Sequence, residues 1–321
     1  MRQKSHDLQY LETLYRRNGL TKLEENEYWK LLKGYQGEVQ FDKFCRYFKE
    51  ELITMDDVTL QLGNSVTQID KLITGKDILW LADIKNYQGK YRYENHCWTR
   101  NESILSNNIC EQLSRACRIV QQILYQEGIK LTVQGVLIFI NPNAQIKIVD
   151  PINELVLDAN QIAQWLLSLK TSSDSVSWQR ALYKYRIPNY KTNRITRPER
   201  FASLKKGVCC PNCGSCTTKK QFRYTLECHC GYSEAKEKAL LRTVCEYGVI
   251  KHDISLKKKD ILKFIGEEYS KSYIETLLKK YFVRLKDTYS YENKGVTYDI
   301  WFDKQKEYFA SMDSRVLWNK K

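Results

Sequence analysis

A small group of acidic residues with one lysine is the strongest chemical signal in the sequence. Asp83 and Lys85 stand two residues apart at the end of an apolar run that is typical of a central β-strand. Residues two apart on a strand point to the same face, so these two side chains leave the strand together. The preceding run carries Gln68 and Asp70, which share a face for the same reason. If the two strands pair as a hairpin, Asp70 and Asp83 can meet on one surface.

A third carboxylate can come from Glu38, at the start of the helix expected before these strands. Carboxylate oxygens suit Mg²⁺, which binds through one or two carboxylates and keeps several waters or a substrate phosphate. A bound ion lowers the pKa of a water and steadies a leaving oxygen, and a nearby lysine can orient the water or stabilise charge at phosphorus. These parts indicate phosphodiester hydrolysis. The alternative, which the pattern leaves open, is structural carboxylates beside a solvated lysine.

A second chemical signal comes from the cysteines, because six of the eleven lie between Cys209 and Cys230. Such clustering in a chain without a secretory signal favours a metal site over a disulfide framework. The C-x₂-C-G and C-x-C-G halves are separated by a length that suits a zinc ribbon. We expect a closed, tetrahedral, structural Zn²⁺ site made by Cys210, Cys213, Cys228 and Cys230, in which Cys209, Cys216 or His229 could replace one ligand.

The charge of the chain is strongly uneven. The formal net charge is +14, and it is carried by residues 170–208 and 209–321, whereas residues 1–169 are close to neutral. A basic half indicates a polyanionic partner, with nucleic acid favoured over the alternative that the charge serves solubility alone. No apolar run approaches the length of a membrane span, and no secretory signal is visible, so we expect a cytoplasmic protein.

Periodicity predicts the elements that must position these residues. Helical spacing covers 5–33, and a further helix is expected after Gly34 and Gly37. Strands are expected at 58–62, 66–73, 78–84 and 131–140, with a hairpin after Gly89 and helices at 106–127 and 158–169. This order predicts an α/β fold whose mixed sheet is built around a hairpin meander.

Three segments resemble the nuclease-related domain, or NERD, family, in the group that is common in Gram-positive bacteria. They are GYQGEVQFDKF at 34–44, VTQIDKLI at 66–73 and LADIKNYQGKYRYE at 81–94. The resemblance continues through 110–124, 136–146 and the cysteine cluster. The family is assigned to the PD-(D/E)xK nuclease superfamily, which implies a restriction-endonuclease-like mixed sheet flanked by helices.

The resemblance also implies a role for each residue of the acidic group. The catalytic and Mg²⁺-binding set would be Glu38, Asp70, Asp83 and Lys85, with Gln68 and Gln112 as substrate contacts or supports for the metal ligands. Two positions depart from the family pattern. Asp83 stands where the family usually has Glu, and its shorter side chain would move the metal slightly. Gln36 replaces the first Glu of the family's G-Y-E-G-E.

The last third of the chain is similar to a winged helix. Residues 256–265, the break at Gly266 and residues 270–281 have the form of a helix-turn-helix, in which Ser270 or Ser272 could cap the second helix. A wing is expected over 284–302. The face predicted to contact nucleic acid carries Lys271, Tyr273, Lys279 and Lys280. The alternative is a small helical bundle whose basic face contacts protein.

Together these observations predict five parts: a helical extension at 1–33, a nuclease-like domain at 34–169, a basic linker at 170–208, a zinc ribbon at 209–232 and a winged-helix-like α+β module at 233–321. The leading hypothesis is Mg²⁺- or Mn²⁺-dependent hydrolysis of DNA, with the C-terminal part binding the substrate. The alternative is a nucleic-acid-binding protein whose nuclease core is inactive or activated by a protein partner.

Overall fold

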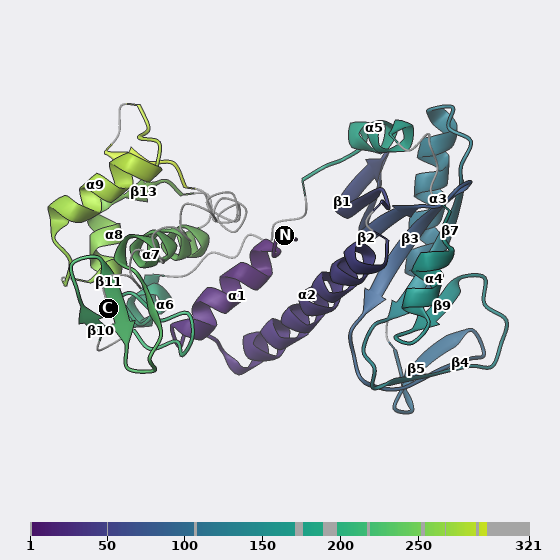
Figure 1. The fold of residues 1–321 in the computed structure, drawn as a ribbon, viewed down its shortest axis with the longest axis horizontal. Helices are drawn as coiled ribbons and strands as arrows, with labels where there is room; N and C mark the ends of the chain where they lie inside the picture. The colour runs from purple at the N-terminus through teal and green to yellow at the C-terminus, as the bar shows by residue number, and fades with distance from the viewer. Residues whose placement is uncertain are drawn as a thin grey trace. The chain divides into compact units, whose positions relative to one another are not determined.

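The computed structural model describes residues 2–49, 51–105, 108–170, 176–188, 198–216, 219–251, 254–266, 268–286 and 289–293. The chain divides into two compact units (Figure 1). The sheet unit comprises Arg2 and residues 30–190, and the cysteine unit comprises residues 3–29 and the chain after 190. Across the described ranges, no helix combines the length and the apolar character that a membrane crossing requires.

A five-stranded mixed sheet forms the centre of the sheet unit. Its order is β1 (Thr54–Leu62), β2 (Ser65–Thr74), β3 (Ile78–Lys85), β7 (Thr132–Phe139) and β9 (Leu155–Asp158). β1, β2 and β3 pair antiparallel, whereas β3, β7 and β9 pair parallel. The predicted α/β class with a mixed sheet around a meander is therefore confirmed.

Alternation along the strands gives this sheet two apolar faces. Leu79 and Leu81 of β3 pack in one core, and Ala82 and Ile84 pack in the other. The first core is covered by α3 (Ile109–Gln126) and α5 (Ser177–Lys184), and the second by α2 (Lys22–Phe48) and α4 (Ile162–Ser168). Figure 1 shows α2 and α3 on opposite sides of the strands. With both faces buried, β3 needs apolar residues almost throughout, as its sequence has.

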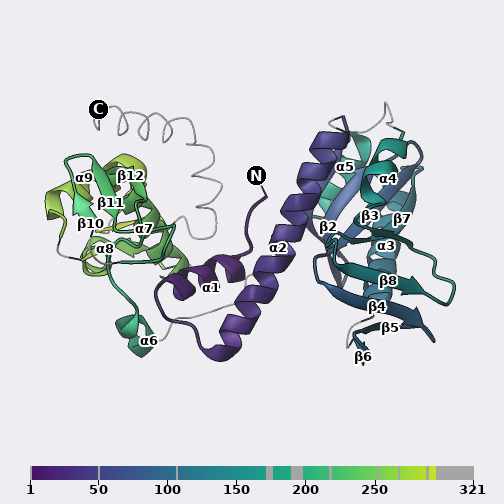
Figure 2. The same cartoon turned by 60° about the horizontal axis from the view of Figure 1, so that its bottom comes forward.

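A second sheet adjoins the end of the first (Figure 2). Its order is β6 (Ser103–Ile104), β5 (Cys97–Arg100), β4 (Gly89–Glu94) and β8 (Ala144–Ile148). β4 and β5 form the hairpin predicted after Gly89. Tyr91 and Trp98 bring their ring centroids to 4.7 and 5.7 Å from that of Phe139, so the small sheet shares the core that α3 covers.

The helix α2 differs from the prediction, which broke the helical segment at Gly34 and Gly37. The structure has one continuous helix from Lys22 to Phe48. A Cβ added at Gly37 would lie 2.5 Å from Cβ of Asn86, so this glycine lets the helix approach the end of β3 closely. Asn86 also donates from Nδ2 to the carbonyl of Lys33 at 2.9 Å. The expected break was wrong because the glycine serves a tertiary contact.

Part of the segment predicted to be a linker is folded onto the sheet unit. α5 buries Trp178 and Leu182 in the core that α3 covers. After α5 the chain runs beside β1, where the Ile187 N–H donates to the carbonyl of Thr59 at 3.0 Å. The division into five domains stays a prediction.

The cysteine unit combines helices with two small sheets. Its elements are α1 (His6–Arg16), α6 (Pro198–Ser203), β10 (Lys219–Gln221), β11 (Thr225–Cys228), β12 (Ser233–Ala235), α7 (Lys236–Lys251), β13 (Leu256–Lys257), α8 (Lys258–Ile265), α9 (Lys271–Tyr281) and β14 (Ser290–Tyr291). The helix expected over 256–265 begins only at Lys258, because Leu256 and Lys257 pair with β14. The predicted wing runs past residue 293, and its remainder lies outside the described residues.

A buried charge network holds the helices of this unit together. Arg17 has a fully buried side chain, and its guanidinium donates to Oε2 of Glu246 on α7 at 2.7 Å and to the carbonyl of Lys205 at 2.8 Å. Its Cζ lies 4.0 Å from the ring centroid of Phe264 on α8. Burial alone would raise the pKa of Glu246, but Arg17 and Arg242 hold that pKa below its ordinary value.

Candidate active site and metal centre

A cavity of about 530 Å³ in the sheet unit is lined by all six residues expected in the nuclease core. They come from four elements: Glu38 from α2, Gln68 and Asp70 from β2, Asp83 and Lys85 from β3, and Gln112 from α3. Antiparallel pairing places β2 beside β3. The helix α3 packs on the face of the sheet that carries Leu79 and Leu81, and it completes the lining of the cavity.

Asp70 lies where β2 and β3 separate. The last paired residues are Lys71 and Ala82, and beyond them the Ile84 N–H donates to Oδ2 of Asp70 at 2.9 Å. Removal from water, and then the negative charge of Asp83, raise the pKa of Asp70 to about 7. A carboxyl group with a raised pKa beside a second acid is a common feature of functional sites.

Asp83 and Lys85 form an ion pair along β3. Nζ of Lys85 lies 2.7 Å from Oδ1 of Asp83, as the two-residue spacing on one strand face predicts. Burial works against the charged lysine, but the charge and hydrogen bond of Asp83 outweigh it and raise the pKa of Lys85. Lys85 is therefore an ammonium ion at neutral pH, suited to donating hydrogen bonds rather than to accepting a proton.

Glu38 has a cationic partner that sequence reasoning missed. NH1 of Arg2 lies 2.9 Å from Oε2 of Glu38 and donates to the carbonyl of Asp70 at 3.0 Å. The same guanidinium contacts Asp42, which also accepts from Nζ of Lys71 at 2.8 Å. Burial, followed by the charge of Asp70, raises the pKa of Glu38 to about 8 despite Arg2. Thirty-six positions separate Arg2 from Glu38, so no local pattern could have indicated this contact.

Two glutamines and one arginine lie at the exposed rim of the cavity. Gln68 donates from Nε2 to Oδ1 of Asp57 at 2.9 Å rather than to a carboxylate of the cavity. Gln112 is exposed on α3, and Arg115 follows it at the three-residue spacing that keeps both on one side of the helix. Arg115 was not among the predicted residues, although a basic side chain one turn after Gln112 was visible in the sequence.

The carboxylates fit a hard divalent cation with an incomplete protein shell. Asp70 and Asp83 line one polar cavity, and Oδ1 of Asp70 and Oδ2 of Asp83 receive no hydrogen bond from any residue that the structure describes. No three carboxylates among the described residues bring their oxygens within 4.8 Å of one another. One or two carboxylates completed by water and substrate oxygens are the usual coordination of Mg²⁺.

The predicted cysteine ligands are gathered into one cluster. The Sγ atoms of Cys210, Cys213, Cys228 and Cys230 all lie within 4.8 Å of one another. The Cys210–Cys230 and Cys213–Cys228 sulfur separations are 3.7 and 3.5 Å. A tetrahedral ion with metal–sulfur bonds of about 2.3 Å requires sulfurs about 3.8 Å apart. The four thiols can therefore hold a structural metal ion such as zinc.

Backbone amides of the two turns that carry the cysteines, Cys210–Cys213 and Cys228–Cys230 (the two knuckles), support these sulfurs. Cys210 accepts from the amides of Asn212 and Cys213, and Cys230 accepts from the amide of Tyr232. The three alternative ligands do not enter the cluster. Cys209 and Cys216 are joined by a disulfide, which withdraws both as ligands. His229 brings its Nδ1 to 3.6 Å from Sγ of Cys228.

The four residues predicted to contact nucleic acid on α9 have different surroundings. The expected cap is confirmed, because Oγ of Ser270 accepts from the Tyr273 N–H at 3.2 Å. Lys279 pairs with Glu275 at 3.1 Å and Lys280 with Glu237 at 2.9 Å. Tyr273 is half-buried beside Lys236. Lys271 is exposed and lines a separate cavity.

Comparison with known proteins gives one match. The family model of the nuclease-related domain, NERD, matches residues 33–140. This range contains all six residues that line the cavity and were expected there. No curated protein and no solved structure matches the chain.

Proposed function

We propose that this chain, whose residues 33–140 form a nuclease-related domain, is a metal-dependent nuclease that hydrolyses phosphodiester bonds of DNA. The observation that carries the proposal is the convergence of two aspartates, one glutamate and a protonated lysine on one cavity from three separate elements. Carboxylates for a metal and a cation for the phosphate are the parts that this hydrolysis requires.

Each residue has a role that follows from its surroundings. Asp70 and Asp83 would hold Mg²⁺ or Mn²⁺, which when bound supplies an activated water and stabilises the leaving oxygen. Lys85, held by Asp83, donates to the negative charge that develops on the phosphate oxygens. Glu38 contributes a third carboxyl group to the cavity, beside the guanidinium of Arg2. Arg115, with Gln68 and Gln112, would contact the DNA backbone at the rim.

Cleavage by paired variants tests the proposal. Supercoiled and linear DNA are incubated with the chain in Mg²⁺, in Mn²⁺ or without added divalent ion. We expect cleavage only with the ion, and a loss of at least about 100-fold in Asp83→Ala and in Lys85→Ala. Asp77→Ala and Lys76→Ala are matched controls, because these side chains form a solvent-exposed pair in the turn just before β3. The proposal is wrong if Asp83→Ala and Lys85→Ala cut as fast as their controls.

The alternative function is nucleic-acid binding by a core that is inactive or activated by a partner. One observation favours it: Glu38 and Asp83 already have cationic partners within the chain, so the acids do not need a metal for charge balance. DNA binding without cleavage, equal in the native chain and in Asp83→Ala, would support this alternative.

We also propose that the four-thiol cluster holds Zn²⁺ as a structural ion. The sulfur separations and the amide support of the knuckles favour a closed site without an open catalytic position. Metal analysis should find one zinc per chain and a loss of that zinc in Cys213→Ser. Cys97→Ser, at an exposed cysteine outside the cluster, should keep it. A zinc-free native chain would refute the assignment.

A further inference from the structure

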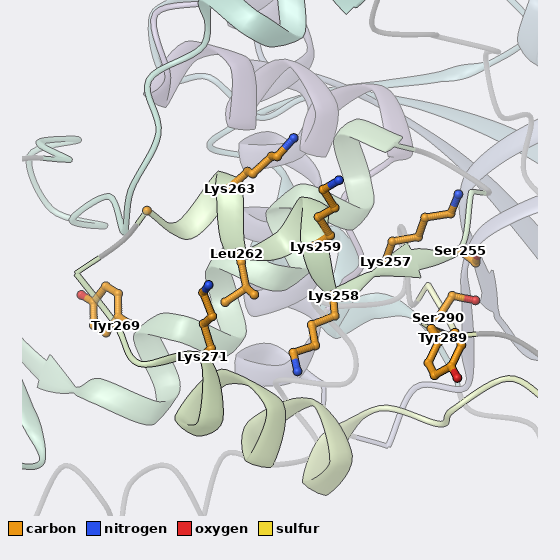
Figure 3. Close-up of a pocket in the computed structure, with 11 residues that line it drawn as sticks. Ser255, Lys257, Lys258, Lys259, Leu262, Lys263, Tyr269, Lys271, Tyr289 and Ser290 are labelled. Carbon is orange, nitrogen blue, oxygen red and sulfur yellow. The ribbon is translucent and has the colours of Figure 1, made fainter.

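We propose that a lysine-lined cavity beside α8 binds a single strand of nucleic acid, with phosphates on the lysines and a base on Tyr289. The cavity has a volume of about 1020 Å³ and lies wholly within the cysteine unit. Figure 3 shows Lys271 rising from the start of α9 toward Leu262 of α8, with Lys257 and Tyr289 at the other end of the lining.

The charge of this cavity is of one sign. Five lysines line it, namely Lys257, Lys258, Lys259, Lys263 and Lys271, and none of the lining residues that the structure describes is acidic. Lys258 is paired with Glu275, whereas the structure shows no acidic partner for the other four among the residues it describes. Four lysines held together without acids repel one another, so an anion that contacts several of them gains favourable energy. A chain of phosphates presents such an anion along its length.

Lys279 and Lys280, which the sequence suggested for this role, are less available. Both ammonium groups are within 3.1 Å of a glutamate oxygen. A phosphate would have to compete with these glutamates, and the net gain would be smaller. The unpaired lysines of α8 and its neighbours therefore offer the better phosphate-binding surface.

Tyr289 favours a nucleic acid over an acidic peptide as the ligand. Its side chain is 89% exposed, and it precedes Ser290, whose carbonyl accepts from the Leu285 N–H at 3.0 Å. Cζ of Arg284 lies 5.5 Å from its ring centroid. An exposed aromatic ring beside a cation is suited to stacking on an unpaired base. A duplex keeps its bases stacked on one another, which is why we assign a single strand.

This inference goes beyond the proposed cleavage, because it assigns binding to residues outside the nuclease-related domain. The test uses the full chain with its metal retained and with Asp83→Ala, so that cleavage cannot interfere. Affinity for a fluorescent single-stranded oligonucleotide is measured by anisotropy over a range of salt concentrations. Failure of binding and failure of cleavage are then separate results.

Two double variants with equal change of charge are compared. Lys259→Ala with Lys263→Ala should bind roughly tenfold more weakly at low salt and lower the salt slope by about 1.4, as loss of two phosphate contacts predicts. Lys279→Ala with Lys280→Ala should stay near the parent affinity. Equal losses in the two double variants, or no loss in the first, would overturn the proposal.

Tyr289 provides a second test that a folding defect cannot imitate, since its side chain is almost wholly exposed. Tyr289→Ala should weaken single-strand binding about tenfold, whereas Tyr289→Phe, which keeps the ring, should not. A duplex of the same sequence should be affected less. Polyglutamate should compete poorly with the oligonucleotide. Competition by polyglutamate as strong as that by unlabelled strand, or equal binding by Tyr289→Ala and Tyr289→Phe, would overturn the assignment of a nucleic-acid strand.

Discussion

Arg2 shows how a single residue far from the sequence motif contributes to the charge balance of the acidic cavity. Its guanidinium contacts Glu38 and Asp42, and its side chain is only 2% exposed. Buried acids without such a partner would raise their pKa further or destabilise the fold. Lys85 also depends on a partner of opposite charge. Burial favours its neutral form, but Asp83 keeps it protonated.

The first prediction concerns Arg2. Arg2→Ala should lower the free energy of unfolding by about 3 kcal/mol, because the carboxylate of Asp42 loses one of its two cationic partners and Glu38 loses a hydrogen-bond donor. Urea unfolding measures the change. Arg46→Ala is the control, since Arg46 is exposed one turn after Asp42 on the same helix. A loss no larger than that of Arg46→Ala would contradict the importance of the buried contact.

At the scale of elements, α2 carries Glu38 to the end of β3, and substitutions at two glycines of this helix should have opposite effects on stability. A Cβ at Gly37 would lie 2.5 Å from Cβ of Asn86, whereas one at Gly34 would meet no atom within 4 Å. The close approach at Gly37 sets the distance between the helix and the strand that bears Asp83.

Alanine substitutions separate these effects. Gly37→Ala should destabilise the chain by about 1–3 kcal/mol, because the methyl group forces α2 away from Asn86. It should also slow cleavage, since Glu38 is the next residue. Gly34→Ala should stabilise the chain by about 0.5–1 kcal/mol through the better helix propensity of alanine. Thermal unfolding and DNA cleavage measure both. Similar effects of the two substitutions would show that Gly37 is only a helix defect.

At the scale of the whole molecule, the N-terminal helix folds with distant segments of the chain. Arg17 of the first thirty residues contacts Glu246 on α7 and the carbonyl of Lys205. This network ties the residue after α1 to α7 within the cysteine unit. Because this ion pair is buried, the stabilisation that it gives the fold depends on Glu246 being ionised.

Glu246→Gln should lower the free energy of unfolding at neutral pH by about 3 kcal/mol, since Arg17 loses its buried counter-charge. The folded state lowers the pKa of Glu246, so its stabilisation is present above the ordinary value of 4.5 and is lost as the pH falls through the lower folded value. The difference between the native chain and the variant should therefore be constant above about pH 4.5 and shrink below it. Glu275→Gln, at a solvent-exposed pair, should show little change. A difference that does not vary with pH would refute the assignment.

Local patterns in the sequence determined those features of this protein that depend on residues close together in the chain. The spacing of Asp83 and Lys85 sets their common face on a strand, and the cysteine knuckles set two pairs of thiols, because strand and turn geometry act over a few residues. Apolar periodicity likewise predicted the mixed sheet and the helix that lines the cavity with Gln112.

The tertiary structure decided what depends on residues distant in the chain. Arg2 forms an ion pair with Glu38, and Lys280 forms one with Glu237, each between residues tens of positions apart. The helix α2 continues through Gly37, where it packs against a distant strand. Such contacts leave no period in the sequence, because they depend on how finished elements pack. For the same reason, the lysines beside α8 for which the described part of the chain holds no acidic partner could be recognised only after the helices were in place.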